Sequence, residues 1–104
     1  MKYFRNSDVE AVIRNKRPSR SKIYSGYRPA FKVKDDYLTT GIIELIDVDE
    51  LPYDNETMAE IWFLTPELYP NCLQVGQEVQ FQEGKVNHGF ITITKINNKI
   101  LEKK

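Results

Sequence analysis

The chain has 104 residues and a mass of 12.2 kDa, which leaves room for one domain spanning residues 1–104 and for no separate catalytic domain. Its hydrophobic content of 40%, with 12% aromatic residues, excludes wholesale disorder. Apolar runs such as Ile61–Leu64 are too short for a transmembrane helix, and the first residues do not resemble a signal peptide. The single cysteine, Cys72, excludes an internal disulfide, so we predict a cytoplasmic protein.

Acidic and basic residues cancel over the whole chain but are segregated along it. Residues 1–34 contain 10 Lys or Arg and 2 acidic residues, a net charge of +8. Residues 35–83 contain 12 acidic residues and no Lys or Arg, whereas residues 84–104 contain 5 Lys and 1 Glu. A fold that interleaves these segments would erase the asymmetry. A fold that keeps them apart would have a basic face and an acidic face, each suited to a different charged partner.

Hydrophobic residues alternate with a period of two along most of the chain, which predicts β-strands. In chain order the predicted strands cover residues 9–14, 31–34, 38–46, 58–64, 79–82 and 90–96. Turn-forming residues separate them at 15–26, 35–36, 47–56, 66–76 and 83–89. A short helical turn is predicted near Asp47–Glu50, and the tail 98–104 is expected to fray. Short strands at this spacing predict a sandwich or a small closed barrel over about residues 7–97.

The common catalytic and metal-binding patterns are missing from the sequence. Without the phosphate-binding loop Gly-x-x-x-x-Gly-Lys-Ser/Thr, we predict neither binding nor hydrolysis of GTP. His88 and Cys72 are too few for a zinc site, and nothing marks them as a nucleophilic pair. The acidic stretch 47–56 lacks the glycine and the spacing of a calcium loop. We therefore expect a non-enzymatic protein with no cofactor and no metal.

Two charged segments are candidate binding sites, although both patterns also fit solvated loops. The basic segment, residues 14–28, combines cations with small hydroxyls and tyrosines, which can hold phosphates and stack on bases. Its candidate residues are Arg14, Lys16, Arg17, Arg20, Lys22, Tyr27 and Arg28. The acidic segment, residues 47–56, would attract a basic protein. Its candidate residues are Asp47, Asp49, Glu50, Asp54 and Glu56.

The segment Ser25–Phe31, with the order Ser-Gly-Tyr-Arg-Pro-Ala-Phe, resembles the Gly-Tyr-Arg-Pro-Gln-Phe motif in the C-terminal, third domain of elongation factor Tu. The resemblance covers about residues 7–97, and Gln80–Gly84 is similar to that domain's Arg-Glu-Gly-Gly turn. It implies a six-stranded antiparallel β-barrel. In the family this domain grips the T-stem of aminoacyl-tRNA and packs against the GTPase domain, which implies binding roles for Arg28, Glu83 and Gly84.

The sequence departs from the family at two of these positions. Ala30 stands where the family has glutamine, and Gln82 stands where it has arginine. Both family groups donate hydrogen bonds, and the loss of a cation weakens any contact with phosphate. The chain also holds no GTPase domain and no second barrel, so we do not expect an elongation factor that cycles on GTP.

Period two and the resemblance together predict the residues that fill the barrel. They are Val9, Ala11, Ile13, Phe31, Val33, Ile43, Leu45, Ile61, Phe63, Val79, Phe81, Ile91 and Ile93. No helix longer than about three turns is expected between residues 8 and 96.

These observations predict a stand-alone binding module of the elongation factor Tu third-domain fold. Its partner would be a protein, or structured RNA such as tRNA bound weakly, in connection with translation. The alternative is an immunity or inhibitor protein that neutralises a toxin by protein–protein binding. The net charge of −12 over residues 35–83 favours this alternative, because acidic residues repel RNA and attract a basic protein, whereas the basic segment favours RNA. We expect neither a membrane nor a nucleotide as a partner.

Overall fold

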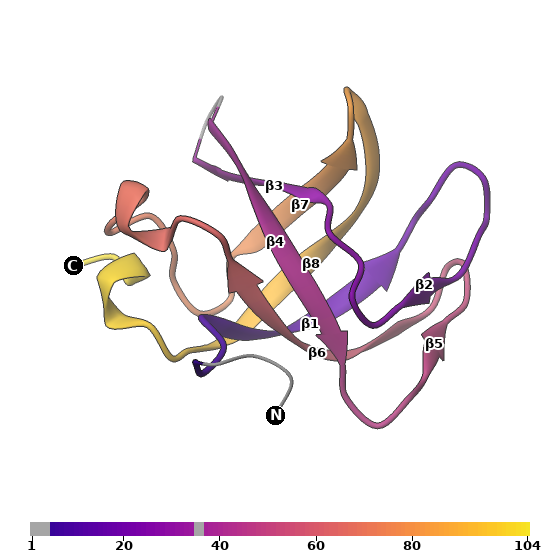
Figure 1. Ribbon diagram of the computed structural model, residues 1–104, viewed down its shortest axis with the longest axis horizontal. Helices are drawn as coiled ribbons and strands as arrows, with labels where there is room; N and C mark the ends of the chain where they lie inside the picture. The colour runs from indigo at the N-terminus through magenta and orange to yellow at the C-terminus, as the bar shows by residue number, and fades with distance from the viewer. Residues whose placement is uncertain (1–4, 35–36) are drawn as a thin grey trace.

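The computed structural model describes residues 5–34 and 37–104, so the predicted turn at Asp35–Asp36 lies outside the described residues. Six antiparallel strands close into a barrel in the order β1-β6-β4-β3-β7-β8 (Figure 1). The barrel strands are Val9–Asn15 (β1), Ala30–Lys34 (β3), Tyr37–Leu45 (β4), Glu56–Phe63 (β6), Glu78–Glu83 (β7) and Val86–Ile96 (β8). The predicted all-β fold with six strands in a closed antiparallel barrel is therefore confirmed.

The predicted core is also confirmed, because all thirteen residues named for it are at most 8% exposed. Three phenylalanines fill one part of it. The ring of Phe31 meets that of Phe63 edge-on at 5.5 Å between centroids, and that of Phe81 at 5.8 Å. Gly41 leaves the space for this cluster, since a Cβ there would lie 2.6 Å from the Phe31 ring. Alternating apolar residues thus face one another inside the barrel, as period two requires.

Two short strands outside the barrel were not predicted. Ile23–Tyr24 (β2) and Glu50–Leu51 (β5) pair as a separate two-stranded sheet, with Ile23 opposite Leu51. The helical turn predicted near Asp47–Glu50 is wrong, because the chain bends at Asp47 (φ 69°) and then extends into β5. Burial of Ile23 and Leu51 stabilises this pairing, although most of the surrounding residues are polar.

The tail is ordered, which corrects the expectation that it frays. Lys99–Leu101 form a 3-10 helix (η2), and Leu101 is only 1% exposed. The backbone joins this helix to the segment before β7. Leu73 N–H donates to the carbonyl of Leu101 at 2.8 Å, and Lys103 N–H donates to that of Leu73 at 2.7 Å. A single buried leucine in a lysine-rich tail is too little apolar sequence to reveal this helix by periodicity.

Buried Asp8 ties the beginning of the chain to the ends of β6 and β8. Its carboxylate accepts hydrogen bonds from Arg5 (2.6 Å), from the side-chain amide of Asn98 (2.9 Å) and from the backbone N–H of Phe63 (2.6 Å). The hydrogen bond to Asp8 raises the pKa of Arg5 above its ordinary value, which keeps the guanidinium charged. The network fixes where β1 enters the barrel.

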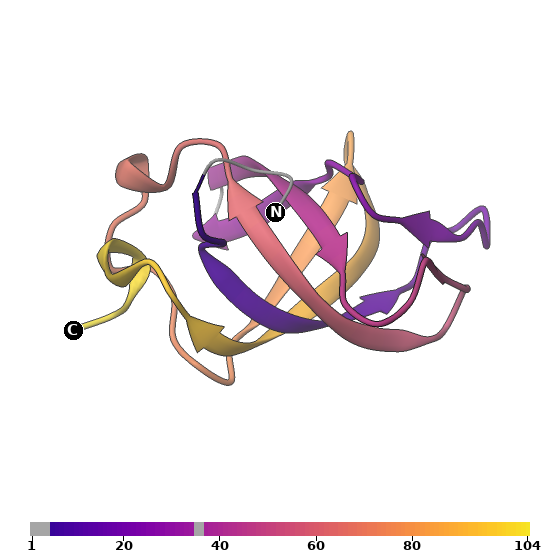
Figure 2. The same ribbon diagram turned by 60° about the horizontal axis from the view of Figure 1, so that its bottom comes forward.

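The remaining elements lie at opposite ends of the molecule. Figures 1 and 2 both place β2 and β5 at one end, and η2 with the second 3-10 helix, Pro66–Leu68 (η1), at the other. Among residues 5–34 and 37–104, no helix has the length and apolar character needed to cross a membrane.

Candidate binding surface

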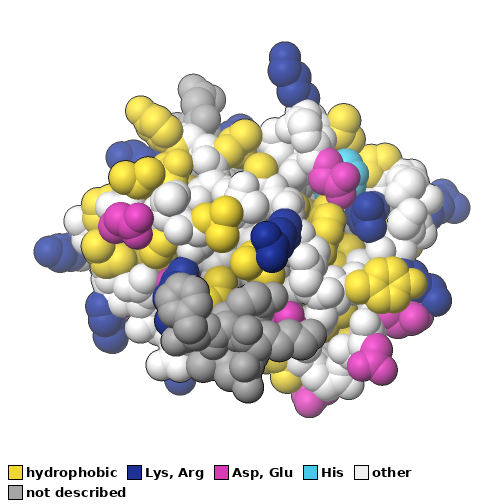
Figure 3. Space-filling view, in the orientation of Figure 1, with side chains coloured by type: hydrophobic (Ala, Val, Ile, Leu, Met, Phe, Trp, Pro, Cys, Tyr) yellow, Lys and Arg dark blue, Asp and Glu magenta, His cyan; other side chains and the backbone are white. Residues whose placement is uncertain are grey.

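The basic and the acidic segments fold against each other at one end of the barrel. Pairing of β2 with β5 brings Tyr24 opposite Glu50. We call this region, comprising residues 14–28, residues 47–56 and Glu83, the mixed-charge end. The fold therefore interleaves the charges that are segregated along the chain, and the two sites predicted from the sequence form one surface. On the right-hand part of Figure 3, acidic and basic side chains accordingly lie among one another.

Asn15 is the polar centre of this end and is fully buried. Its side-chain amide donates to the carbonyls of Ser21 (2.8 Å) and Leu51 (3.0 Å), one in each segment. Its side-chain oxygen accepts from the N–H of Arg17 at 3.0 Å. Its backbone carbonyl accepts from the N–H of Asp54 at 2.8 Å. One asparagine thus satisfies buried backbone groups of both segments and fixes their relative position.

Carboxylates of the acidic segment neutralise three of the predicted phosphate-binding cations. Arg14 forms ion pairs with Glu56 and with Asp54, and Lys16 lies 2.5 Å from Asp54. The hydrogen bond and the charge of Lys16 lower the pKa of Asp54 below its ordinary value. The ammonium group of the third cation, Lys22, lies 2.5 Å from a carboxylate oxygen of Glu50.

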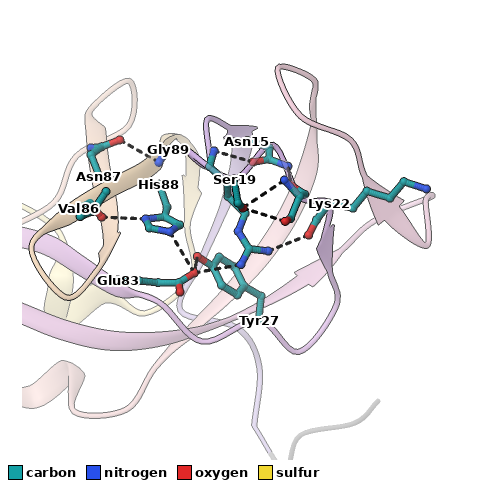
Figure 4. A network of polar contacts seen from close by, with 11 residues as sticks. Asn15, Ser19, Lys22, Tyr27, Glu83, Val86, Asn87, His88 and Gly89 are labelled. Carbon is teal, nitrogen blue, oxygen red and sulfur yellow. Dashed lines mark hydrogen bonds and ion pairs between the residues drawn. The ribbon is translucent and has the colours of Figure 1, made fainter.

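Arg17 belongs to a cluster centred on Glu83, which Figure 4 shows together with Tyr27 and His88. One carboxylate oxygen of Glu83 accepts from the hydroxyl of Tyr27 at 2.5 Å and lies 3.4 Å from Arg17 and 3.6 Å from the Nε2 of His88. The guanidinium of Arg17 also lies over the Tyr27 ring, 5.1 Å from its centroid, and donates to the carbonyl of Lys22. Burial and the hydrogen bond to Glu83 raise the pKa of Tyr27, so its hydroxyl stays protonated.

The structure thus brings together residues predicted on separate grounds: Arg17 and Tyr27 from the basic segment, and Glu83 from the resemblance. Gly84 lies in the tight turn after β7 with φ of +60°. Gln82, at the position of the family arginine, donates to the carbonyl of Gly84 at 2.6 Å and so supports this turn. Its amide is engaged within the chain.

The other predicted residues are more available. Arg20 lies over the Tyr53 ring at 5.4 Å from its centroid and is otherwise exposed. Arg28, Asp47 and Asp49 are exposed, and within the described part of the chain no carboxylate or cation pairs with them.

Sequence reasoning missed Asn15, Tyr53 and His88 as parts of this surface. Asn15 and Tyr53 stand among turn-forming residues, and their roles depend on contacts with segments 33 or more residues away. The sequence predicts that His88 lies in a turn, but the turn is shorter than predicted and His88 lies within β8. Its side chain is 13% exposed, and its Nδ1 is 2.8 Å from the carbonyl of Val86.

Metal binding and nucleophilic chemistry would each depend on a small set of side chains among the described residues. No group of three or more His, Cys, Asp and Glu side chains among them is placed to hold a metal ion. Cys72 is buried in the segment between η1 and β7, and burial raises the pKa of its thiol, which disfavours the nucleophilic thiolate. The mixed-charge end combines charges, hydrogen-bonding groups and aromatic rings. Neither a protein-family model nor a curated protein sequence matches this chain.

Proposed function

We propose that the protein is a non-enzymatic binding module whose main ligand is another protein, bound at the mixed-charge end. The observation that carries this proposal is the internal pairing of the basic segment. Arg14, Lys16 and Lys22 each face a carboxylate of the acidic segment, and Arg17 faces Glu83. A nucleic acid would have to displace these carboxylates to make phosphate contacts, which supply most of the affinity of such complexes.

The chemistry of this end suits a protein partner. Tyr24 is 55% exposed and Val48 is 40% exposed, and both lie among charged side chains. Protein interfaces combine such apolar or aromatic anchors with a polar rim. A rim in which both signs alternate selects its partner through the pattern of charges, and like charges brought together by a wrong partner are repelled.

Structured RNA is the second candidate. Arg20 and Arg28 are exposed without an ion-pair partner among the described residues, and Tyr24 offers a ring for stacking. The resemblance to the third domain of elongation factor Tu supports this candidate and a connection with translation. The immunity or inhibitor alternative draws support from Asp47 and Asp49, which have no cation beside them and suit a basic toxin. In either case we propose the cytoplasm as the location.

A titration with tRNA separates the two ligand classes. At about 0.15 M salt we expect a dissociation constant in the non-specific range, roughly 10⁻⁴ to 10⁻⁶ M. Replacing Arg17, Arg20 and Arg28 by Ala should lower the slope of log affinity against log salt by about two to three if these residues contact phosphates. Nanomolar binding that survives this salt concentration would make RNA the main ligand.

Charge reversal tests whether a protein partner binds at the mixed-charge end. The variant with Asp49, Glu50 and Asp54 changed to Lys should lose a protein partner captured from lysate by the wild-type chain. Lys95, whose side chain is 67% exposed on β8, provides the control, because Lys95→Glu changes surface charge away from this end. A partner retained by the triple variant and lost by the control would refute the assignment to the mixed-charge end.

A further inference from the structure

A second candidate surface lies at the opposite end of the barrel. Tyr37 and Leu38 begin β4, Leu64 follows β6, and Leu68 ends η1. All four are large apolar side chains, and each is between 41% and 66% exposed. Figure 3 shows apolar side chains on the left part of the face that it draws, where Figure 1 places η1. Exposed apolar residues that gather in one patch typically mark an interaction site.

Two of these residues, Tyr37 and Leu68, line a groove with a volume of about 390 Å³, together with Lys34, Tyr69 and Pro70. We call this the apolar groove. Its volume lies within the range of small ligand sites, so it can receive one large side chain. Three separate segments build it, since Lys34 ends β3, Tyr37 begins β4, and the other three residues belong to η1 and the residues that follow it.

The walls of the groove are fixed by contacts between these segments. The hydroxyl of Tyr69 donates to the backbone carbonyl of Leu38 at 3.0 Å. The Tyr37 and Tyr69 rings lie 6.4 Å apart between centroids, inclined at 60°. The η1 turn is anchored from below by buried Pro66. Because the groove is formed before a partner binds, binding does not include the entropic cost of ordering its walls.

Charge indicates what kind of partner fits the groove. Lys34 lines it, and Lys32 is exposed two residues earlier on the same outward side of β3. Neither lysine has an ion-pair partner among the described residues. The backbone N–H of Lys103 donates to the carbonyl of Leu73, so a further lysine lies at this end of the molecule. Lysine at the rim of an apolar groove attracts a carboxylate.

We propose that the apolar groove docks a short segment of a partner protein that carries one large apolar side chain next to acidic residues. The apolar side chain fills the groove between Tyr37 and Leu68, and the carboxylates pair with Lys34 and Lys32. This site is separate from the mixed-charge end, so the proposal does not depend on the function proposed there. Two docking sites at opposite ends would let the barrel bridge two proteins.

The test uses the full chain and three fluorescein-labelled peptides. The first has the order Gly-Phe-Glu-Thr-Glu-Phe-Gly, which presents the same side chains in either direction. The second has Ala in place of both Phe residues, and the third has Lys in place of both Glu residues. We expect saturable binding of the first peptide by fluorescence anisotropy, and affinities lower by about tenfold or more for the other two, because each loses the apolar or the charge contact. Asp35 and Asp36 follow Lys34 in the sequence and lie outside the described residues. If these two carboxylates governed the charge preference of the site, the third peptide would bind better than the first.

Variants then assign the binding to this groove. Leu68→Ser should weaken the first peptide by about tenfold, and Lys34→Glu should reverse the preference, so that the lysine peptide binds better than the glutamate peptide. Both residues are exposed, so both variants should keep the wild-type melting temperature. Lys95→Glu is the matched control and should change nothing.

Several results would overturn the proposal. They are equal affinities for the three peptides, absence of saturable binding at millimolar concentration, and a Lys34→Glu variant that keeps its preference for glutamate. Chemical shift changes confined to the mixed-charge end on adding the first peptide would also refute it. Analytical ultracentrifugation tests whether a second copy of the chain occupies the groove instead. A dimer that forms in the wild-type protein and is lost in Leu68→Ser would show this.

Discussion

At the mixed-charge end, polar side chains connect segments distant in the sequence, in addition to the buried pair Ile23 and Leu51. Asn15 bonds to both segments, and ion pairs surround it. At the opposite end, the segments are connected by backbone hydrogen bonds between residue 73 and residues 101–103, and by burial of Leu73 and Leu101. The stability of the polar contacts depends on charge, salt and pH, whereas the stability of the buried contacts depends on the apolar area removed from water. The two ends should therefore respond differently to the same perturbation.

The largest expected effect is at the end that depends on burial. Leu101→Ala removes a side chain that is 1% exposed and should lower the free energy of unfolding by about 2–5 kcal/mol. Urea denaturation followed by tryptophan fluorescence measures it. The thiol of Cys72, buried close to η2, should at the same time react faster with an alkylating reagent. Ile100→Ala is the control, since Ile100 is 43% exposed. Equal losses in the two variants would show that η2 is not held by Leu101.

The second effect concerns the buried asparagine at the other end. Asn15→Ala leaves the carbonyls of Ser21 and Leu51 without their donor and should lower the free energy of unfolding by about 1–3 kcal/mol. Asn15→Asp should cost more, because it places a carboxylate against two carbonyl oxygens. Asn55→Ala, at an exposed position in the same region, should cost less. Chemical denaturation ranks the three, and a cost of Asn15→Asp below that of Asn15→Ala would contradict the hydrogen-bond assignment.

The difference between the two ends also explains what could be read from the sequence. The barrel and its core follow from alternation, because a strand with one buried face must alternate, and Val9, Phe31 and Ile91 lie where the pattern places them. The charges of the basic and acidic segments are equally visible in the sequence. Their mutual pairing is not, because it depends on β2 meeting β5, two strands of two residues each.

The order of η2 escaped prediction for a related reason. Its stability comes from Leu101 and from backbone contacts with Leu73, and neither has a local pattern. The resemblance predicts a role for Glu83, and the composition of the basic segment predicts roles for Arg17 and Tyr27. Their convergence on one carboxylate required the barrel to place β7 beside the basic segment.

A third prediction uses the internal ion pairs to control RNA binding. Replacing Asp54 by Asn and Glu56 by Gln frees Arg14 and Lys16. If each freed cation then contacts a phosphate, the slope of log affinity for tRNA against log salt should steepen by about two. The matched control is Glu67→Gln with Glu78→Gln, which removes the same charge from η1 and β7. Equal steepening in both variants would mean that net charge alone governs binding and that the pairing does not mask the basic segment.

The smallest effect expected is a difference in acid sensitivity between the two ends. Lys16 lowers the pKa of Asp54, so this carboxylate contributes stability above its ordinary pKa of 3.8, and the contribution is lost as the pH falls through the lower value in the folded state. Between about pH 5 and pH 3, hydrogen exchange at the N–H of Asp54, which donates to Asn15, should lose protection once the intrinsic pH dependence of exchange is removed. The N–H of Leu73 at the other end should keep its protection, because its partner is the carbonyl of Leu101 and no carboxylate takes part in that bond. Adding salt at pH 5 should reproduce part of the loss at Asp54 by screening Lys16, and should leave Leu73 unaffected. If both amides lose protection together, the chain opens as a single unit under acid, and the distinction between a polar end and an apolar end does not extend to local stability.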